Sequence, residues 1–296
     1  MDAIKMLTEE VNPSSHGIDR LSTQAMLERI HAEDQAALAA VSRATPAIAR
    51  AVDAIVERMR NGGRLFYVGA GTSGRLGIID AVECVPTFNT PPELVQGVIA
   101  GGEQAFTQSV EGVEDDAQAG AGELKERGLT PKDAVIGIAA SGRTPFVIGA
   151  LIYAHSLGAL TIGIANNSPS EVLTCADYAI PLVTGPEVIA GSTRMKAGTA
   201  QKMTLNMIST TTMIQLGKVY DNLMVDVQVK NEKLRRRAIG LIRQLTGVDE
   251  HHAENLLFES GRSVKVAVVM ARRGVSAADA QALLDAAGGA LRAVID

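Results

Sequence analysis

The segment Phe66-Tyr-Val-Gly-Ala-Gly-Thr-Ser-Gly-Arg75 is a short apolar run that ends in a loop rich in glycine and hydroxyl groups. Five such apolar runs occur, each flanked by Gly, Pro, Asn or Asp and separated from the next by a helical stretch. This alternation is typical of a parallel sheet that helices cover on both faces. We therefore predict an α/β fold with a doubly wound, five-stranded parallel sheet and right-handed crossovers. The predicted strands are residues 64–69, 94–100, 134–139, 159–164 and 178–183.

The segments outside this sheet have helical periodicity. We predict two amphipathic helices over residues 22–60, broken near Thr45-Pro46 because proline removes a helical N–H. One long helix is expected over residues 193–217 and another over residues 223–245, with a small three-helix pattern from Gly247 onward. The predicted domains are an N-terminal helical arm (1–60), a sugar-phosphate-binding domain with trailing helices (61–246), and a small three-helix, UBA-like subdomain (247–296).

The composition argues against nucleic-acid-binding and membrane-spanning proteins. The chain has 296 residues, a net charge of -5 and only two cysteines. An acidic chain argues against a nucleic-acid partner, and it requires any phosphate ligand to be held by local groups. The N-terminus lacks the order of a signal peptide, and no apolar stretch reaches the ~18 residues of a membrane span. We expect a cytoplasmic protein with no membrane or nucleic-acid partner.

A second loop, Ala140-Ser-Gly-Arg-Thr-Pro145, follows the predicted strand 134–139 and resembles the loop after Gly69. In open parallel sheets, ligands bind beyond the carboxyl ends of the strands, where helix N-termini offer free N–H groups to a phosphate. Glycine allows close approach of the backbone, and serine and threonine add hydroxyl donors. The pair of loops therefore predicts one site that holds a sugar phosphate, although either loop alone is equally compatible with a simple turn.

Competing motifs are incomplete. Gly69–Gly74 matches the dinucleotide fingerprint, but the next predicted strand ends in Ala100-Gly101-Gly102 without the acidic residue that binds ribose. The lysine of a phosphate-binding P-loop is also missing. The five histidines form no H-x-x-x-H or H-E-x-x-H pattern, so we expect neither a metal site nor a cofactor.

Longer stretches resemble one family. They are LTEEVNPSSHGID, YVGAGTSGRLGIIDAVECVPTF, VEGVEDD, IAASGRTP, GPEVIAGSTRMKAGTAQKMTLNMIST and KVYDNLMVDVQVKNEKLRRRA. In order and spacing they are similar to the N-acetylmuramic acid 6-phosphate etherases, from Leu7 to the C-terminal helices. The resemblance implies a SIS-type three-layer αβα fold, a phosphosugar substrate and a homodimer. One departure is Asn89, where the family pattern leads us to expect glycine.

The resemblance also implies a reaction and its residues. The family removes a D-lactyl ether from C3 of a 2-acetamido sugar 6-phosphate by elimination and then hydration, without a redox cofactor. Glu83 corresponds to the general acid at the lactyl oxygen and Glu114 to the base at C2. The residues that we expect to bind the phosphate and sugar are Gly71, Thr72, Ser73, Ser141, Gly142, Arg143, Thr144, Ser192 and Lys196.

Several alternatives stay open at this point. Spacing does not separate Glu114 from Glu111, and Asp80 or Asp115 can support or replace the two glutamates. Arg75 and Arg143 can each clamp a phosphate or point into solvent, and the cluster 192–196 can bind the sugar or cap a helix. A catalytically silent phosphosugar sensor, an aldose–ketose phosphosugar isomerase and a dinucleotide oxidoreductase remain the competing functions.

Overall fold

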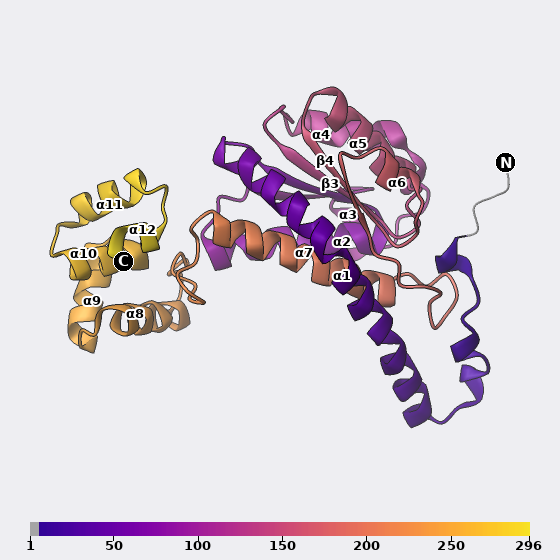
Figure 1. Cartoon of the computed structure of the whole chain (residues 1–296), viewed down its shortest axis with the longest axis horizontal. Helices are drawn as coiled ribbons and strands as arrows, with labels where there is room; N and C mark the ends of the chain where they lie inside the picture. Colours follow the sequence, from indigo (N-terminus) through magenta and orange to yellow (C-terminus); the bar gives the residue numbers. More distant parts are fainter. Residues whose placement is uncertain (1–5) are drawn as a thin grey trace. The chain divides into compact units, whose positions relative to one another are not determined.

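The structure is a computed structural model that describes residues 6–296, so residues 1–5 of the predicted N-terminal arm lie outside the described residues (Figure 1). The chain divides into two compact units. The first unit runs to Ala81 and includes Glu93–Ile208, and the second comprises Val82–Pro92 and Ser209–Asp296. Two of the boundaries fall within helices, one in α2 (Gly71–Phe88) and one in α7 (Lys196–Gln215).

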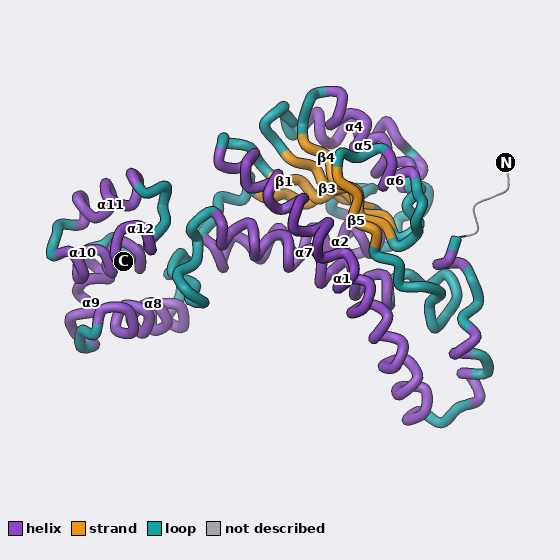
Figure 2. Tube along the Cα trace, in the orientation of Figure 1, coloured by secondary structure: helices purple, strands orange, loops and turns teal. Residues whose placement is uncertain are grey.

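The first unit contains the predicted sheet, which is drawn in orange in Figure 2. Its five strands are all parallel and lie in the order β2-β1-β3-β4-β5. The strands β1, β3 and β4 are buried at every position, as expected for a sheet covered on both faces. The α/β fold class predicted from the apolar runs is therefore confirmed. The strands are β1 (Leu65–Gly69), β2 (Val95–Ile99), β3 (Ala134–Ala139), β4 (Leu160–Ala165) and β5 (Tyr178–Pro181).

Alternate side chains of β1 pack on opposite layers of helices. Phe66 and Val68 belong to a buried cluster with residues of α4 (Ala117–Glu126) and α5 (Pro145–Ser156). Tyr67 points to the other face, where it lies against Gly77 of α2. The sheet thus sits between two helical layers. The remaining connections hold the short elements α3 (Gln104–Thr107), η4 (Val113–Asp115) and α6 (Glu171–Thr174).

Helix α1 covers Thr23–Arg60 without interruption, so the predicted break near Thr45-Pro46 is wrong. Proline removes one helical hydrogen bond, yet side chains on both sides of it are buried, among them Ala44 and Ile48. Helix α1 packs against β4 and β5, and burial of one continuous apolar stripe outweighs the local cost of the proline.

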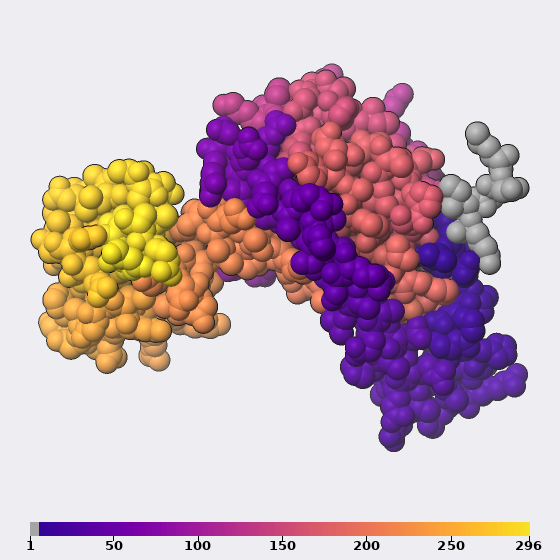
Figure 3. Space-filling view, viewed as in Figure 1, coloured from indigo at the N-terminus to yellow at the C-terminus, as the bar shows by residue number. Residues whose placement is uncertain are grey.

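The chain before α1 is built from three short 3₁₀ helices, η1 (Leu7–Glu9), η2 (Pro13–Ser15) and η3 (Ile18–Arg20). It runs beside the amino-terminal half of α1, and both form the indigo to violet surface in the space-filling view (Figure 3). Gly191 N donates to Thr8 O, and Ser15 Oγ donates to Val188 O, so this segment contacts the connection between β5 and α7.

The second unit is helical, and its core is formed by buried residues from Val225 to Ile295. The helix predicted from residue 223 begins only at Glu232, because Asn231 caps it and Asp226 pairs with Lys218 and Lys265. Four helices follow where three were predicted. They are α9 (Glu250–Glu259), α10 (Val264–Arg273), α11 (Ala277–Ala286) and α12 (Leu291–Ile295), after α8 (Glu232–Thr246).

Asn89 adopts a φ of 52°, in the left-handed region that favours glycine and tolerates asparagine. Asparagine at a position where we expected glycine therefore fits the local backbone. Within residues 6–296, none of the helices has the length and apolar character needed to cross a membrane.

Candidate active site

The first hydroxyl-rich loop is a direct turn from β1 into α2. Strand β1 ends at Gly69 and α2 begins at Gly71, whose φ is 52°. A Cβ on Gly69 would lie 2.6 Å from the backbone nitrogen of Gly74, so only glycine allows so tight a turn. The first turn of α2 therefore presents its N–H groups beyond the carboxyl end of β1, where an anion is favoured.

A cavity of about 430 Å³ opens beside this turn. Glu114 lies on η4 and lines the cavity together with Gly71, and both glutamate side chains of the segment, Glu111 and Glu114, are exposed. The first loop and Glu114, the predicted base, thus line one pocket at the carboxyl ends of β1 and β2. Its lining residues are Ala70, Gly71, Arg75, Ala100, Ala105, Ser109, Val110, Glu111, Gly112, Val113 and Glu114.

Ser73 has a role that the sequence did not indicate. Its side chain is buried, and its Oγ donates to Gln201 Oε1 at 2.9 Å. Gln201 Nε2 donates in turn to Asn166 Oδ1 at 2.9 Å, and Asn166 Nδ2 donates to Leu182 O. This buried relay ties the start of α2 to α7 and to the ends of β4 and β5. The sequence does indicate a position near the site for Asn166, because this residue follows the predicted strand 159–164 at the carboxyl edge of the sheet.

The second loop adopts a different geometry on the neighbouring strand β3. Gly142 has a φ of 71°, and a Cβ there would lie 2.4 Å from the Ser170 side chain. Ser141 Oγ accepts a hydrogen bond from Arg143 N at 3.2 Å, and Thr144 is the N-cap residue of α5. Ser141 and Arg143 line a separate small cavity of about 20 Å³, to which Leu7 also contributes.

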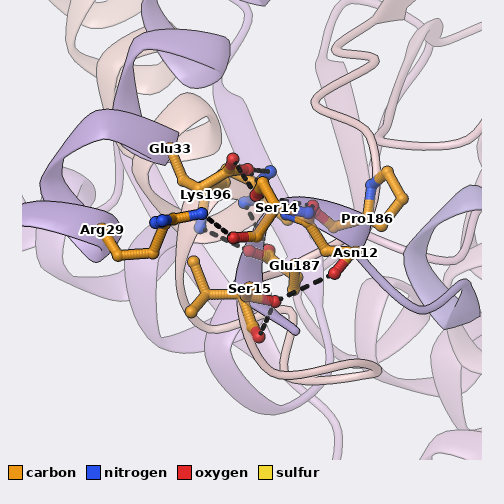
Figure 4. Close-up of polar contacts among 10 residues, drawn as sticks. Asn12, Ser14, Ser15, Arg29, Glu33, Pro186, Glu187 and Lys196 are labelled. Atoms are coloured by element: carbon orange, nitrogen blue, oxygen red, sulfur yellow. Dashed lines mark hydrogen bonds and ion pairs between the residues drawn. The ribbon is translucent and has the colours of Figure 1, made fainter. Parts of the chain in front are cut away.

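Lys196 is the first residue of α7, and its side chain points toward Glu33 (Figure 4). Only 2% of the residue is exposed, and its Nζ lies 2.6 Å from Glu33 Oε2 of α1. Its backbone N and that of Ala197 donate to the carboxylate of buried Glu187, at 3.0 and 2.9 Å. A carboxylate at this position satisfies N–H groups of the first helical turn and complements the helix dipole. Ser192, four residues before Lys196, is half-buried.

Glu33 collects several hydrogen bonds. Asn12 Nδ2 donates to Oε2 at 2.7 Å, Ser14 Oγ donates to Oε1, and Lys196 Nζ donates to Oε2. Partial burial acts to raise the pKa of Glu33, but these bonds outweigh it and hold the pKa below its ordinary value. A depressed carboxyl pKa adds stability above the unfolded value, and that stability is lost as the pH falls through the folded value.

Replacing Lys196 with methionine is expected to lower the free energy of unfolding by about 3–5 kcal/mol, because a buried charge pair loses one partner. Urea unfolding of the variant and the parent protein measures this difference. Adding Glu33→Gln should recover part of the loss, since the unpaired carboxylate is then removed. Equal destabilisation of the single and double variants would contradict the ion-pair explanation.

The other acidic residues have distinct surroundings. Glu83 lies on α2 with an exposed side chain, and Asp115 is exposed next to Glu114. Asp80 is buried, and its carboxylate accepts hydrogen bonds from Tyr67 Oη at 2.9 Å and from Asn206 Nδ2 at 2.8 Å. Asp80 therefore ties α2 to β1 and α7. Among residues 6–296, no group of three or more His, Cys, Asp or Glu side chains is placed to hold a metal ion.

Models of three protein families match the chain. The glucokinase regulatory protein N-terminal SIS domain matches residues 47–155, the SIS domain matches residues 117–211, and the C-terminal lid domain of glucokinase regulatory protein matches residues 221–264. Among solved structures, a putative phosphosugar isomerase involved in capsule formation from Bacteroides fragilis is 23% identical, with a TM-score of 0.51. That likeness covers 67% of this chain and 94% of the other, and it concerns the fold alone.

Similarity to named proteins extends over nearly the whole chain. An N-acetylmuramic acid 6-phosphate etherase from Caldanaerobacter subterraneus subsp. tengcongensis is 53% identical over 285 residues, which cover 96% of this chain and 93% of the relative. One from Escherichia fergusonii is 51% identical over 296 residues, covering 100% of this chain and 99% of the relative. The chain therefore belongs to the N-acetylmuramic acid 6-phosphate etherase family.

Proposed function

We propose that the protein is a carbon–oxygen lyase that cleaves the D-lactyl ether of N-acetylmuramic acid 6-phosphate. Its products are N-acetylglucosamine 6-phosphate and D-lactate, as in the recycling of cell-wall amino sugars. The observation that carries this proposal is the identity of 51–53% with relatives of that name along almost the full chain. The pocket that joins Glu114 to the first turn of α2 supports it with suitable chemistry.

The first half of the reaction is an elimination. Opening of the sugar ring gives an aldehyde at C1, which acidifies the proton on C2. Glu114 removes that proton as a general base, and the C3–O bond breaks as Glu83 protonates the departing lactyl oxygen. The lactyl group leaves as D-lactate, and the sugar becomes an unsaturated aldehyde with a C2–C3 double bond. Each acid–base group of this kind typically contributes about 10²–10⁴-fold in rate.

The second half restores the sugar. Glu83, now ionised, takes a proton from a water molecule, and the hydroxide adds to C3. Glu114, now protonated, returns a proton to C2. Glu83 and Glu114 thus each change protonation state twice and end as they began. The elimination and the hydration together consume no external oxidant or reductant.

The O6 phosphate is the handle that orients the substrate. We assign its binding to the loop residues Gly71, Thr72, Ser141, Gly142, Arg143 and Thr144, with Ser192 nearby in the chain connection to α7. Backbone N–H groups and hydroxyls suit a phosphate in an acidic protein. The side chain of Ser73 contacts Gln201, and that of Lys196 contacts Glu33. We therefore assign Ser73 and Lys196 to stabilising the N-terminal ends of α2 and α7, respectively.

The test combines product analysis with isotopes. Incubation with N-acetylmuramic acid 6-phosphate in D₂O containing H₂¹⁸O is expected to release D-lactate. The sugar product should carry deuterium at C2 and ¹⁸O at C3, while the lactate retains its original oxygen. Oxygen-18 in the lactate hydroxyl would indicate attack on the lactyl carbon instead. An intact ether with a moved carbonyl would indicate an isomerase, and unreacted substrate bound to folded protein would indicate a sensor.

We also propose that the protein is a cytoplasmic homodimer. Leu27 and Leu38 of α1 leave 62% and 45% of their surfaces exposed, and exposed apolar side chains on one helix suit an interface with a second copy. The chain has only two cysteines, which is compatible with a reducing compartment. Light scattering at micromolar concentration decides between one and two chains.

A further inference from the structure

Arg75 occupies an unusual position in the pocket. It lies one turn into α2 and lines the same cavity as Glu114. Its guanidinium donates from Nε to the carbonyl oxygen of Phe106 at 3.1 Å, and from Nη2 to the carbonyl oxygen of Gln108 at 2.8 Å. Phe106 lies in the last turn of α3 and Gln108 is the C-cap residue after it, where main-chain carbonyls have no partner within the helix. The fork of the guanidinium satisfies two main-chain acceptors together.

The chain that follows these two carbonyls carries the predicted base. Residues 106–109 and 111–112 are exposed, so this stretch buries little apolar surface that would fix its path. Gly112 precedes η4 with a φ of 78°, and Glu114 follows two residues later. Val113 packs against Gly101, which anchors the far end of the stretch. The hydrogen bonds from Arg75 therefore anchor the near end to α2.

We propose that Arg75 is a positioning residue that holds the Glu114 segment at a set distance from the first turn of α2. The first turn of α2 is assigned to the phosphate, and Glu114 is assigned to the C2 proton. Arg75 therefore fixes the position of Glu114 relative to the proposed phosphate-binding turn. This inference rests on the proposed role of Glu114, and it differs from a role for Arg75 as a phosphate clamp.

The Arg75→Lys variant separates these two roles. Lysine keeps a positive charge but has no planar fork, so it does not hold two carbonyls in the same geometry. If Arg75 positions the segment, kcat should fall by about 10²-fold, the effect of misplacing a reacting group by about 1 Å. KM should stay within about threefold of the parent value, because phosphate binding is left in place.

Arg58 provides a matched control. It lies at the end of α1, and its Nη1 donates to the carbonyl oxygens of Pro131 and Gly158, which precede β3 and β4 at the opposite edge of the sheet. Arg58→Lys therefore removes the same kind of bridging arginine far from the pocket. We expect its kcat and KM to match those of the parent protein.

Hydrogen exchange gives a readout that does not depend on turnover. In the protein without substrate, Arg75→Lys should accelerate amide exchange across residues 105–114, and Arg58→Lys should not. A KM raised about tenfold with kcat unchanged would identify a phosphate clamp and overturn the proposal. Unchanged exchange in that segment would also overturn it. If the parent protein releases no D-lactate, the proposed function fails, while the exchange experiment still decides whether Arg75 holds the segment.

Discussion

Replacing Glu114 with glutamine is expected to lower the rate of D-lactate release by about 10²–10⁴-fold, because the amide cannot accept the C2 proton. Glutamine has nearly the same shape as glutamate, and the exposed side chain lines an open pocket. The variant should therefore keep the fold and the phosphate-binding site. Titration calorimetry with the phosphosugar should therefore give an affinity close to that of the parent protein. Initial rates of D-lactate formation measure the loss in kcat.

Two further variants make this result specific. Glu126→Gln, at the end of α4, changes an exposed glutamate outside the pocket lining and should retain parent turnover. Glu111→Gln tests the other glutamate of the pocket, three residues before Glu114. A large loss in Glu111→Gln with near-normal turnover in Glu114→Gln would transfer the role of base to Glu111.

Glu83→Gln is expected to reduce D-lactate release by a similar factor, about 10²–10⁴-fold, for a different reason. An alkoxide is a poor leaving group, so the C3–O bond breaks slowly unless the lactyl oxygen is protonated as it departs. Glutamine at this exposed position of α2 has no acidic proton to give. Steady-state D-lactate assays measure the loss, and circular dichroism checks that the variant is folded.

Asp80 should not rescue the Glu83 variant, although it lies one helical turn earlier. Its buried carboxylate is occupied by the Tyr67 hydroxyl and the Asn206 amide, at 2.9 and 2.8 Å. Buried groups in a satisfied hydrogen-bond network are held in place and do not turn toward solvent. Parent-level D-lactate release by Glu83→Gln would contradict the assignment of Glu83 as the acid.

The sheet was predictable because its signal is local. Each apolar run is long enough for one buried strand and is bounded by glycine or another turn residue, as in Leu65–Gly69 before Gly71. The two loops could be placed at one edge because the carboxyl ends of parallel strands share that edge. The continuity of α1 through Pro46 was not predictable, since it depends on apolar side chains that are buried against β4 and β5.

Sequence patterns could not predict the hydrogen-bond partners of Ser73, Lys196 and Arg75. The first loop suggests that Ser73 binds the phosphosugar, and the polar cluster 192–196 suggests the same for Lys196. Their side-chain partners Gln201 and Glu33 are 128 and 163 residues away in the chain, so no local pattern indicates these two contacts. Such contacts arise only when α1, α2 and α7 are packed against one sheet. The role of Arg75 is hidden for the same reason, because its acceptors are main-chain carbonyls that carry no sequence signal.

Exchange of the C2 proton with solvent deuterium, followed by NMR in the Glu83 and Glu114 variants, tests the two-glutamate mechanism most directly. Glu83→Gln should exchange this proton while leaving the ether intact, because Glu114 can still remove and return it. Glu114→Gln should neither exchange the proton nor release D-lactate. Exchange by Glu114→Gln at the parent rate would show that another group removes the proton and would contradict the mechanism.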